Sequence, residues 1–261
     1  MPFEQEAFPV LVCDLLDGKD LQRLADCEVA GVHIRGALSP EMCAVVCAAV
    51  ARQRFDDYDI ERYRLPAARL GPSLNEAREN GGIDAGYWRR SEDALGFWRG
   101  DPDCERVRSS CADLLRQAWP GDIGPARAGG RPLYWGIVRE LSHGAVVHCD
   151  DVVFEYGRAL FEQPPVVQLG FNLFIAAPRA GGETVIWQKR RSPADERHRV
   201  GVGYDPAVVA ECPSAVIKPN AGDVVIFDSR NLHAVRPGDG RRITVSFFVG
   251  ITDNGDLILW S

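Results

Sequence analysis

The stretch "AGDVVIFDSRNLHAVRPGDGRRITVSFF", residues 221–248, contains two strand-forming runs joined through a short polar turn. Val, Ile and Phe dominate both runs, at 224–227 and 243–248, and "RPGDG" between them has the Pro and Gly residues that favour turns. This arrangement predicts two antiparallel strands. A histidine before the turn, His233, and an arginine after it, Arg242, would then return to one pocket.

The same pattern of strand-forming runs and turns continues through the second half of the chain. Runs rich in Val, Ile, Phe and Trp, such as "VVQLGFNLFIAA", "ETVIWQ" and "SAVIKP", are separated by Gly and Pro. Many short strands with few helices between them predict an antiparallel sandwich or jelly roll.

The first half is more helical in pattern. Residues 39–55 and 101–120 each open with a capping residue followed by Pro, which is typical of a helix start. Residues 79–88 are expected to form a loop. The sequence therefore predicts a mainly β fold with flanking helices, as one domain over 1–261: a helical part at 1–125 packs on the outside of a β core at 126–261.

Composition restricts the class of protein. A formal net charge of -7 and a pI of about 5.3 argue against nucleic-acid binding, which calls for a basic face. The eight cysteines form no CxxC pair, "MPFEQEAFPV" has neither a basic start nor an apolar run, and no stretch is long and apolar enough for a membrane span. We expect a cytoplasmic enzyme of small molecules with reduced thiols, and the oligomeric state stays open.

The stretch "VVHCDDVV", residues 146–153, places four polar or reactive residues between valines. Side chains two apart on a strand share a face, so His148 and Asp150 are expected to converge. With His233 they would form the two-histidine, one-carboxylate facial triad of non-haem Fe(II) oxygenases. The His-x-Asp tripeptide alone is weak evidence for a metal site, because His148 could equally be a hydrogen-bonded histidine of the core.

The residues after His233 strengthen that reading. Arg242 follows it by nine residues, and Thr244 and Ser246 share the face of the predicted strand. An arginine fork beside a hydroxyl suits two-point binding of a carboxylate.

With these residues in place, about 130–250 resembles the C-terminal core of the Fe(II)/2-oxoglutarate-dependent dioxygenases. The parts occur in the family's order: His148 and Asp150, Gly181-Gly182-Glu183, Gly222-Asp223, His233, Arg242. The resemblance implies a double-stranded β-helix of the jelly-roll or cupin-like kind, with His148, Asp150 and His233 holding Fe(II). It also implies that Arg242, aided by Thr244, binds the distal carboxylate of 2-oxoglutarate, and that O2 is the other co-substrate.

A second resemblance concerns the subgroup. "HCDDVV", "FNLFIAAPRAGGETVIW", "SPADERHR", "GYDPAVVA" and "GDLILWS" are similar to a bacterial subgroup of radical halogenases and free amino-acid hydroxylases, notably of lysine. The halogenases have Gly or Ala at the carboxylate position, so Asp150 implies hydroxylation. In the subgroup the following acid helps to hold the substrate, which here is Asp151.

Four residues are expected to contact substrate, and one further residue the co-substrate. Asp151 would enter the pocket if the strand ends or bulges there, Gln168 shares a strand face with Asn172, Trp135 precedes the HxD strand, and Arg78 lies in a loop near the pocket mouth. Asn172 would bind 2-oxoglutarate or substrate, or serve as a structural hydrogen bonder. No catalytic residue is expected beyond the metal ligands.

The function predicted is hydroxylation of an unactivated C–H bond in a small molecule, with a free cationic amino acid such as lysine as first candidate. A same-family desaturase, epimerase or halogenase of a natural-product intermediate is the main alternative. A non-catalytic cupin-like binding protein is a remote one, because it would not need Arg242. The charged segment 188–199 is either a solvated loop or a lid.

Overall fold

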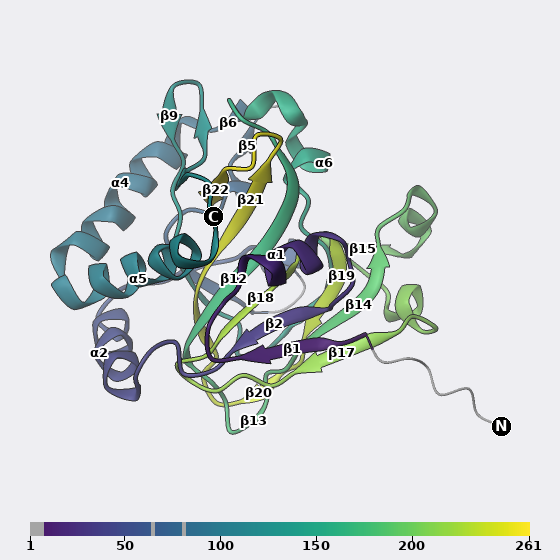
Figure 1. Cartoon of the computed structure of the whole chain (residues 1–261), viewed down its shortest axis with the longest axis horizontal. Coiled ribbons are helices and arrows are strands. Elements are labelled where there is room, and N and C mark those ends of the chain that lie inside the picture. The colour runs from purple at the N-terminus through teal and green to yellow at the C-terminus, as the bar shows by residue number, and fades with distance from the viewer. Residues whose placement is uncertain (1–7, 64–65, 80–81) are drawn as a thin grey trace.

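Two β-sheets form the centre of the chain in this computed structural model, which describes residues 8–63, 66–79 and 82–261 (Figure 1). The larger sheet has the strand order β1-β2-β18-β12-β21-β10-β4-β3, extended by β22 on β21 and β7 on β22. Its strands are β1 (Val10–Cys13), β2 (Gly31–Ile34), β3 (Asp56–Asp57), β4 (Ala68–Leu70), β7 (Ile123–Pro125), β10 (Ile137–Glu140), β12 (Pro165–Ala176), β18 (Val224–Asp228), β21 (Ile243–Thr252) and β22 (Leu257–Trp260).

The smaller sheet has the order β15-β16-β11-β19-β14-β17. Its strands are β11 (Ala145–His148), β14 (Thr184–Arg190), β15 (Arg199–Val200), β16 (Gly203–Tyr204), β17 (Ser214–Ile217) and β19 (Asn231–Val235). Short pairs are β5 (Arg78–Glu79) with β6 (Gly82–Ile83), β8 (Arg127–Ala128) with β9 (Arg131–Pro132), and β13 (Ala180–Gly181) with β20 (Gly238–Asp239). The predicted double-stranded β-helix is confirmed.

Helices lie outside this core, with the longest of them together on one side (Figure 1). They are α1 (Gly18–Ala25), α2 (Pro40–Ala51), α3 (Ile60–Tyr63), α4 (Ala85–Gly100), α5 (Pro102–Ala118) and α6 (Val152–Tyr156), with 3-10 helices η1 (Leu74–Glu76), η2 (Arg158–Leu160), η3 (Pro193–His198) and η4 (Pro206–Val209). The predicted helix starts are present, because Ser39 accepts a hydrogen bond from the Met42 amide and Asp101 accepts from the Cys104 amide. Within the described ranges, no helix is both apolar and long enough to cross a bilayer.

Alternation along the strands of the larger sheet separates two environments. Val224 and Ile226 of β18 pack in the core that includes the helices, whereas Val225 and Phe227 pack between the two sheets. On β21, Val245 faces the helix side, and the neighbouring Thr244 is buried on the opposite face. The inner face of β21 therefore carries polar groups toward the smaller sheet.

The predicted division at residue 125 needs correction, because the first part is not only helical. β1 and β2 extend the larger sheet through pairing of β2 with β18, and β3 and β4 extend its other edge beyond β10. These additions satisfy backbone groups that the edges of the core strands would otherwise expose.

Another expectation about the first half of the chain differs from the structure. The expected loop at 79–88 is also corrected: Asp84 caps α4 by accepting from the Tyr87 amide, so Tyr87 lies in a helix. Residues 80–81 of that stretch, and residues 1–7 of "MPFEQEAFPV", lie outside the described residues.

Candidate active site

Two histidines face each other across neighbouring strands of the smaller sheet. His148, the last residue of β11, is the cross-strand partner of His233 on β19, and their ring centroids are 4.2 Å apart. Nδ1 of His148 lies 2.8 Å from the Val146 carbonyl oxygen, and Nδ1 of His233 lies 2.9 Å from that of Asn231. A carbonyl oxygen only accepts, so each Nδ1 carries a proton, and Nε2 is the ring nitrogen that can bind a metal.

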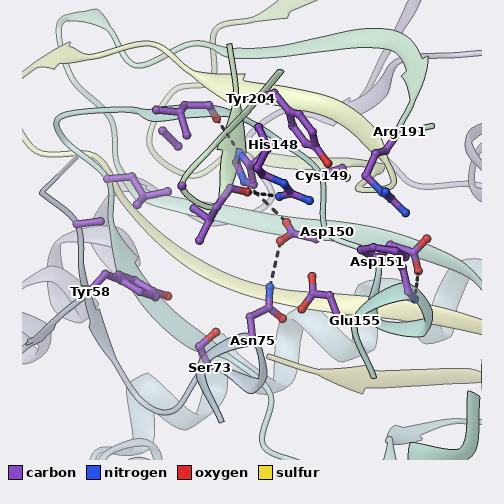
Figure 2. Close-up of a pocket in the computed structure, with 18 of the residues that line it drawn as sticks. Tyr58, Ser73, Asn75, His148, Cys149, Asp150, Asp151, Glu155, Arg191 and Tyr204 are labelled. Atoms are coloured by element: carbon purple, nitrogen blue, oxygen red, sulfur yellow. Dashed lines mark hydrogen bonds and ion pairs between the residues drawn. The ribbon is translucent and has the colours of Figure 1, made fainter. Parts of the chain in front are cut away.

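The Asp150 carboxylate completes this group. Its Oδ2 lies 3.9 Å from Nε2 of His148 and 3.6 Å from Nε2 of His233, and the candidate ligand atoms of the three residues all lie within 4.8 Å of one another. Asn75 donates to the other oxygen, Oδ1, at 3.2 Å (Figure 2). Two imidazoles and one carboxylate fit Fe(II), and the arrangement is the one that the sequence predicts.

Burial keeps His233 in the protonation state that a metal ligand needs. The pKa of His233 is lowered to about 3, first by desolvation and then by its neighbour His148. The ring is therefore neutral at physiological pH and available for coordination.

Asp150 does not lie on a strand as expected, since β11 ends at His148. Its backbone is instead held by three hydrogen bonds: the Asp150 amide donates to the Ser229 carbonyl at 2.9 Å, and the Asp150 carbonyl accepts from Ser229 Oγ and Gln168 Nε2, both at 3.1 Å. These three hydrogen bonds, rather than the pleat of a strand, hold the carboxylate beside the histidines.

Gln168 is thereby corrected from a substrate contact to a positioning residue. Its side chain is buried on β12, and its Oε1 accepts from the Val152 amide at 2.8 Å while its Nε2 reaches Asp150. Both polar ends hydrogen bond to the backbone that joins Asp150 to α6.

Replacing Gln168 with Leu is expected to lower the free energy of unfolding by roughly 1–3 kcal/mol, because a buried amide and a buried carbonyl lose a partner. Metal affinity should also fall, on the order of 10- to 100-fold, because the turn that aims a ligand is loosened. Thermal unfolding and metal titration measure the two effects. Gln188→Leu, an exposed residue on β14, is the matched control. Wild-type affinity in Gln168→Leu would contradict the positioning role.

Arg242 is a buried cation near the histidines. It is 2% exposed, its Nε donates to the Gly182 carbonyl and its Nη2 to Thr184 Oγ1, both at 3.2 Å. Burial lowers its pKa to about 10, and it forms no ion pair with any carboxylate in the described part of the chain. A buried unpaired cation requires an anion from elsewhere.

A cavity of about 60 Å³ lies between Arg242 and the histidines. Asn172 and Ser246 line it, and Ser246 Oγ donates to Asn172 Oδ1 at 2.8 Å. The carboxylate of 2-oxoglutarate suits this space, since it would reach Arg242 from the metal side.

The hydroxyl beside Arg242 belongs to Thr184, not to Thr244 as expected. Thr244 is fully buried, and its Oγ1 hydrogen bonds with Ser246 Oγ at 2.8 Å. Thr184 lies on β14 of the opposite sheet, and no signal in the sequence links it to Arg242, because their proximity arises only when the two sheets face each other.

A second, larger cavity of about 570 Å³ opens beside His148 and Asp150. Its wall carries four arginines and two acids besides Asp150: Arg78, Arg139, Arg191, Arg199, Asp151 and Glu155. Asp151 enters because the strand has ended, and its carboxylate caps α6 by accepting from the Phe154 amide at 3.0 Å. The structure thus brings two predicted substrate contacts, Asp151 and Arg78, to this cavity.

Trp135 is corrected, because its ring packs away from both cavities. It lies edge-on to Phe247 with centroids 5.3 Å apart, and the Arg108 guanidinium lies 4.0 Å from its centroid. Trp135 precedes β10, and its ring joins the core on the helix side of the larger sheet.

Other cavity residues were not singled out from the sequence. Asn75, Ser73 and Tyr58 come from the polar first half, which carries no motif there, and Figure 2 shows them below and beside Asp150. The charged segment 188–199 contributes Arg191 and Arg199 to the wall, so it is more than a solvated loop.

Comparisons with known proteins agree with this geometry. Residues 143–261 match the family described as carrier-protein-independent halogenase WelO5. The L-gamma-glutamyl-L-propargylglycine hydroxylase of Streptantibioticus cattleyicolor is 35% identical over 258 residues, which cover 97% of this chain and 96% of that protein.

Two solved structures are similar in fold. An N-substituted L-amino acid dioxygenase from Burkholderia ambifaria has a TM-score of 0.60 at 17% identity, covering 94% of this chain and 91% of that one. HygX from Streptomyces hygroscopicus, with nickel and 2-oxoglutarate bound, has a TM-score of 0.52 at 14% identity, covering 90% of this chain and 87% of that one. These likenesses support the two-sheet fold.

Proposed function

The chain belongs to the Fe(II)/2-oxoglutarate-dependent dioxygenases, in the group of WelO5-type halogenases and amino-acid hydroxylases, and we propose that it hydroxylates an unactivated C–H bond of an amino acid or amino-acid derivative. The observation that carries the proposal is the convergence of His148, Asp150 and His233 next to a buried, unpaired Arg242. A cupin-like binding protein without turnover would have no use for that cation.

We propose specific roles for the residues of the site. His148, Asp150 and His233 would hold Fe(II), and Arg242 with Thr184 would hold the distal carboxylate of 2-oxoglutarate, with Asn172 and Ser246 on the wall between. When bound, the iron and 2-oxoglutarate supply the oxidising chemistry. Asn75 fixes the rotation of the Asp150 carboxylate, and Gln168 and Ser229 fix its backbone.

Asp150 also bears on the outcome of the reaction. Radical halogenases of the family have Gly or Ala at this position, where chloride binds. A carboxylate there favours hydroxylation over chlorination. Desaturation and epimerisation would use the same residues, so product analysis has to separate them from hydroxylation.

The substrate has two candidates. A free cationic amino acid such as lysine is supported by the acids Asp151 and Glu155 on the cavity wall. A γ-glutamyl amino acid, the kind of compound in the name of the Streptantibioticus cattleyicolor relative, is supported by the arginines, which outnumber those acids. The arginines favour the second candidate, because carboxylates are the partners that a guanidinium binds best.

Succinate release tests the proposed function. Protein with Fe(II), 2-oxoglutarate and a panel of proteinogenic amino acids, ornithine and γ-glutamyl amino acids is expected to form succinate above background with at least one compound. Mass spectrometry should find a product heavier by one oxygen atom, with or without chloride present. Stimulation by none of the panel would refute the substrate class, and a chlorinated product would refute the hydroxylase assignment.

A further inference from the structure

Arg191 occupies a distinct part of the larger cavity. In Figure 2 it lies with Asp151 on one side of Asp150, whereas Tyr58 and Ser73 lie on the other side. Arg191 directly follows β14 and faces α6, the short helix that contains Glu155 and is capped by Asp151. Both acids line the cavity near Arg191.

Two contacts fix the Arg191 guanidinium. Its Cζ lies 3.5 Å from the centroid of the Phe154 ring on α6, and its Nη1 donates to Glu196 Oε1 at 2.9 Å. The side chain is only 17% exposed. Its Nε and Nη2 form no hydrogen bond with any other residue that the structure describes. Arginine can bind a carboxylate through this edge with two parallel hydrogen bonds, and the contacts with Phe154 and Glu196 orient it.

The neighbouring arginine differs in this respect. Arg199 donates from Nε and Nη2 to Glu196 and from Nη1 to the Val202 carbonyl, so its three nitrogens are all used. Glu196 also accepts from Tyr204, and its pKa is lowered first by the hydrogen bond from Arg199, so it is ionised. One carboxylate therefore serves two guanidinium groups, and Arg191 keeps its Nε and Nη2 for an anion from elsewhere.

We propose that the Nε and Nη2 edge of Arg191 binds a second carboxylate of the substrate, so that the substrate carries two carboxylates and one ammonium, as γ-glutamyl amino acids do. The inference rests on the proposed function and adds the substrate class and a specificity residue. An α-amino acid end bears a carboxylate and an ammonium on one carbon, and Arg191 beside Asp151 offers partners for both. The other carboxylate then faces the opposite wall, where Arg139 donates to the Tyr58 hydroxyl at 3.1 Å.

Three ligands test the carboxylate contact and the ammonium contact separately. γ-Glutamyl-norvaline has all three charged groups, 4-aminobutyryl-norvaline lacks the glutamyl carboxylate, and glutaryl-norvaline lacks the ammonium. Calorimetry without oxygen, on protein loaded with Fe(II) and 2-oxoglutarate, measures the binding of each to wild type and to Arg191→Gln. The matched control is Arg197→Gln, which removes an exposed arginine of η3 that contacts His198.

Arg191→Gln is expected to weaken the binding of γ-glutamyl-norvaline and glutaryl-norvaline by roughly 10- to 100-fold. The affinity for 4-aminobutyryl-norvaline should stay nearly unchanged. Arg197→Gln should leave all three unchanged. Equal losses for all three ligands, no loss for any, or no binding of γ-glutamyl-norvaline by wild type would overturn the inference. If free amino acids are then turned over, the proposed function stands and only the role of Arg191 fails. If no compound stimulates succinate release, the proposed function and the role of Arg191 both fail.

Discussion

His148→Ala is expected to abolish Fe(II) binding and turnover while the protein stays folded. The variant removes one of three candidate ligands, whose Nε2 lies 3.9 Å from the Asp150 carboxylate. Loss of a group that merely orients a ligand costs on the order of 10- to 100-fold in affinity, so loss of the ligand itself should cost more. Anaerobic titration with Fe(II) and succinate release measure the two effects, and circular dichroism checks the fold.

The matched control for this variant is His143→Ala. His143 is exposed and lies five residues before His148, outside the metal group found among the described residues. Its replacement should leave Fe(II) affinity and turnover as in wild type. His233→Ala should repeat the loss seen with His148→Ala, because the two rings are cross-strand partners. Wild-type turnover in either triad variant would show that the ligand assignment is wrong.

Arg242→Ala is expected to raise the KM for 2-oxoglutarate steeply. Truncating one partner of a buried charge-assisted pair costs roughly 2–5 kcal/mol, which corresponds to about 30-fold or more. The neighbouring Arg241 is the matched control, because it lies at the surface and pairs with Glu140 through Nη2 and Oε2 at 2.6 Å. Initial rates at varied 2-oxoglutarate concentration give the KM of each variant. A KM that rises in Arg241→Ala and not in Arg242→Ala would show that Arg241 binds the carboxylate of 2-oxoglutarate.

A stability measurement separates this effect from misfolding. Burial lowers the pKa of Arg242 to about 10, which means that its charged form is disfavoured in the folded protein without an anion. Arg242→Met removes that charge and keeps much of the volume, but the Gly182 carbonyl and Thr184 Oγ1 lose a donor, so its melting temperature without 2-oxoglutarate should be somewhat lower than that of wild type. The added stability that 2-oxoglutarate gives to wild type should be lost in this variant.

Much of the fold follows from local pattern. The alternation in β18 and β21 assigns Val225 and Thr244 to the inner face because side chains on a strand change sides at every residue. Capping residues before Pro located the starts of α2 and α5. The short strands β1 and β2 were not predicted, since four residues carry little periodicity and the strand that joins them to the sheet, β18, is about two hundred residues away from β2.

The chemistry of the site can be predicted from sequence alone: His148, Asp150, His233 and Arg242 are recognisable because their order and spacing resemble those of the Fe(II)/2-oxoglutarate-dependent dioxygenases. Which side chains surround these residues depends on how the chain packs. Thr184 beside Arg242, Asn75 on Asp150, the Gln168 clamp and the open edge of Arg191 all depend on hydrogen-bond geometry between segments far apart in the chain. Such partners are set by how the sheets and loops pack, which no local spacing encodes.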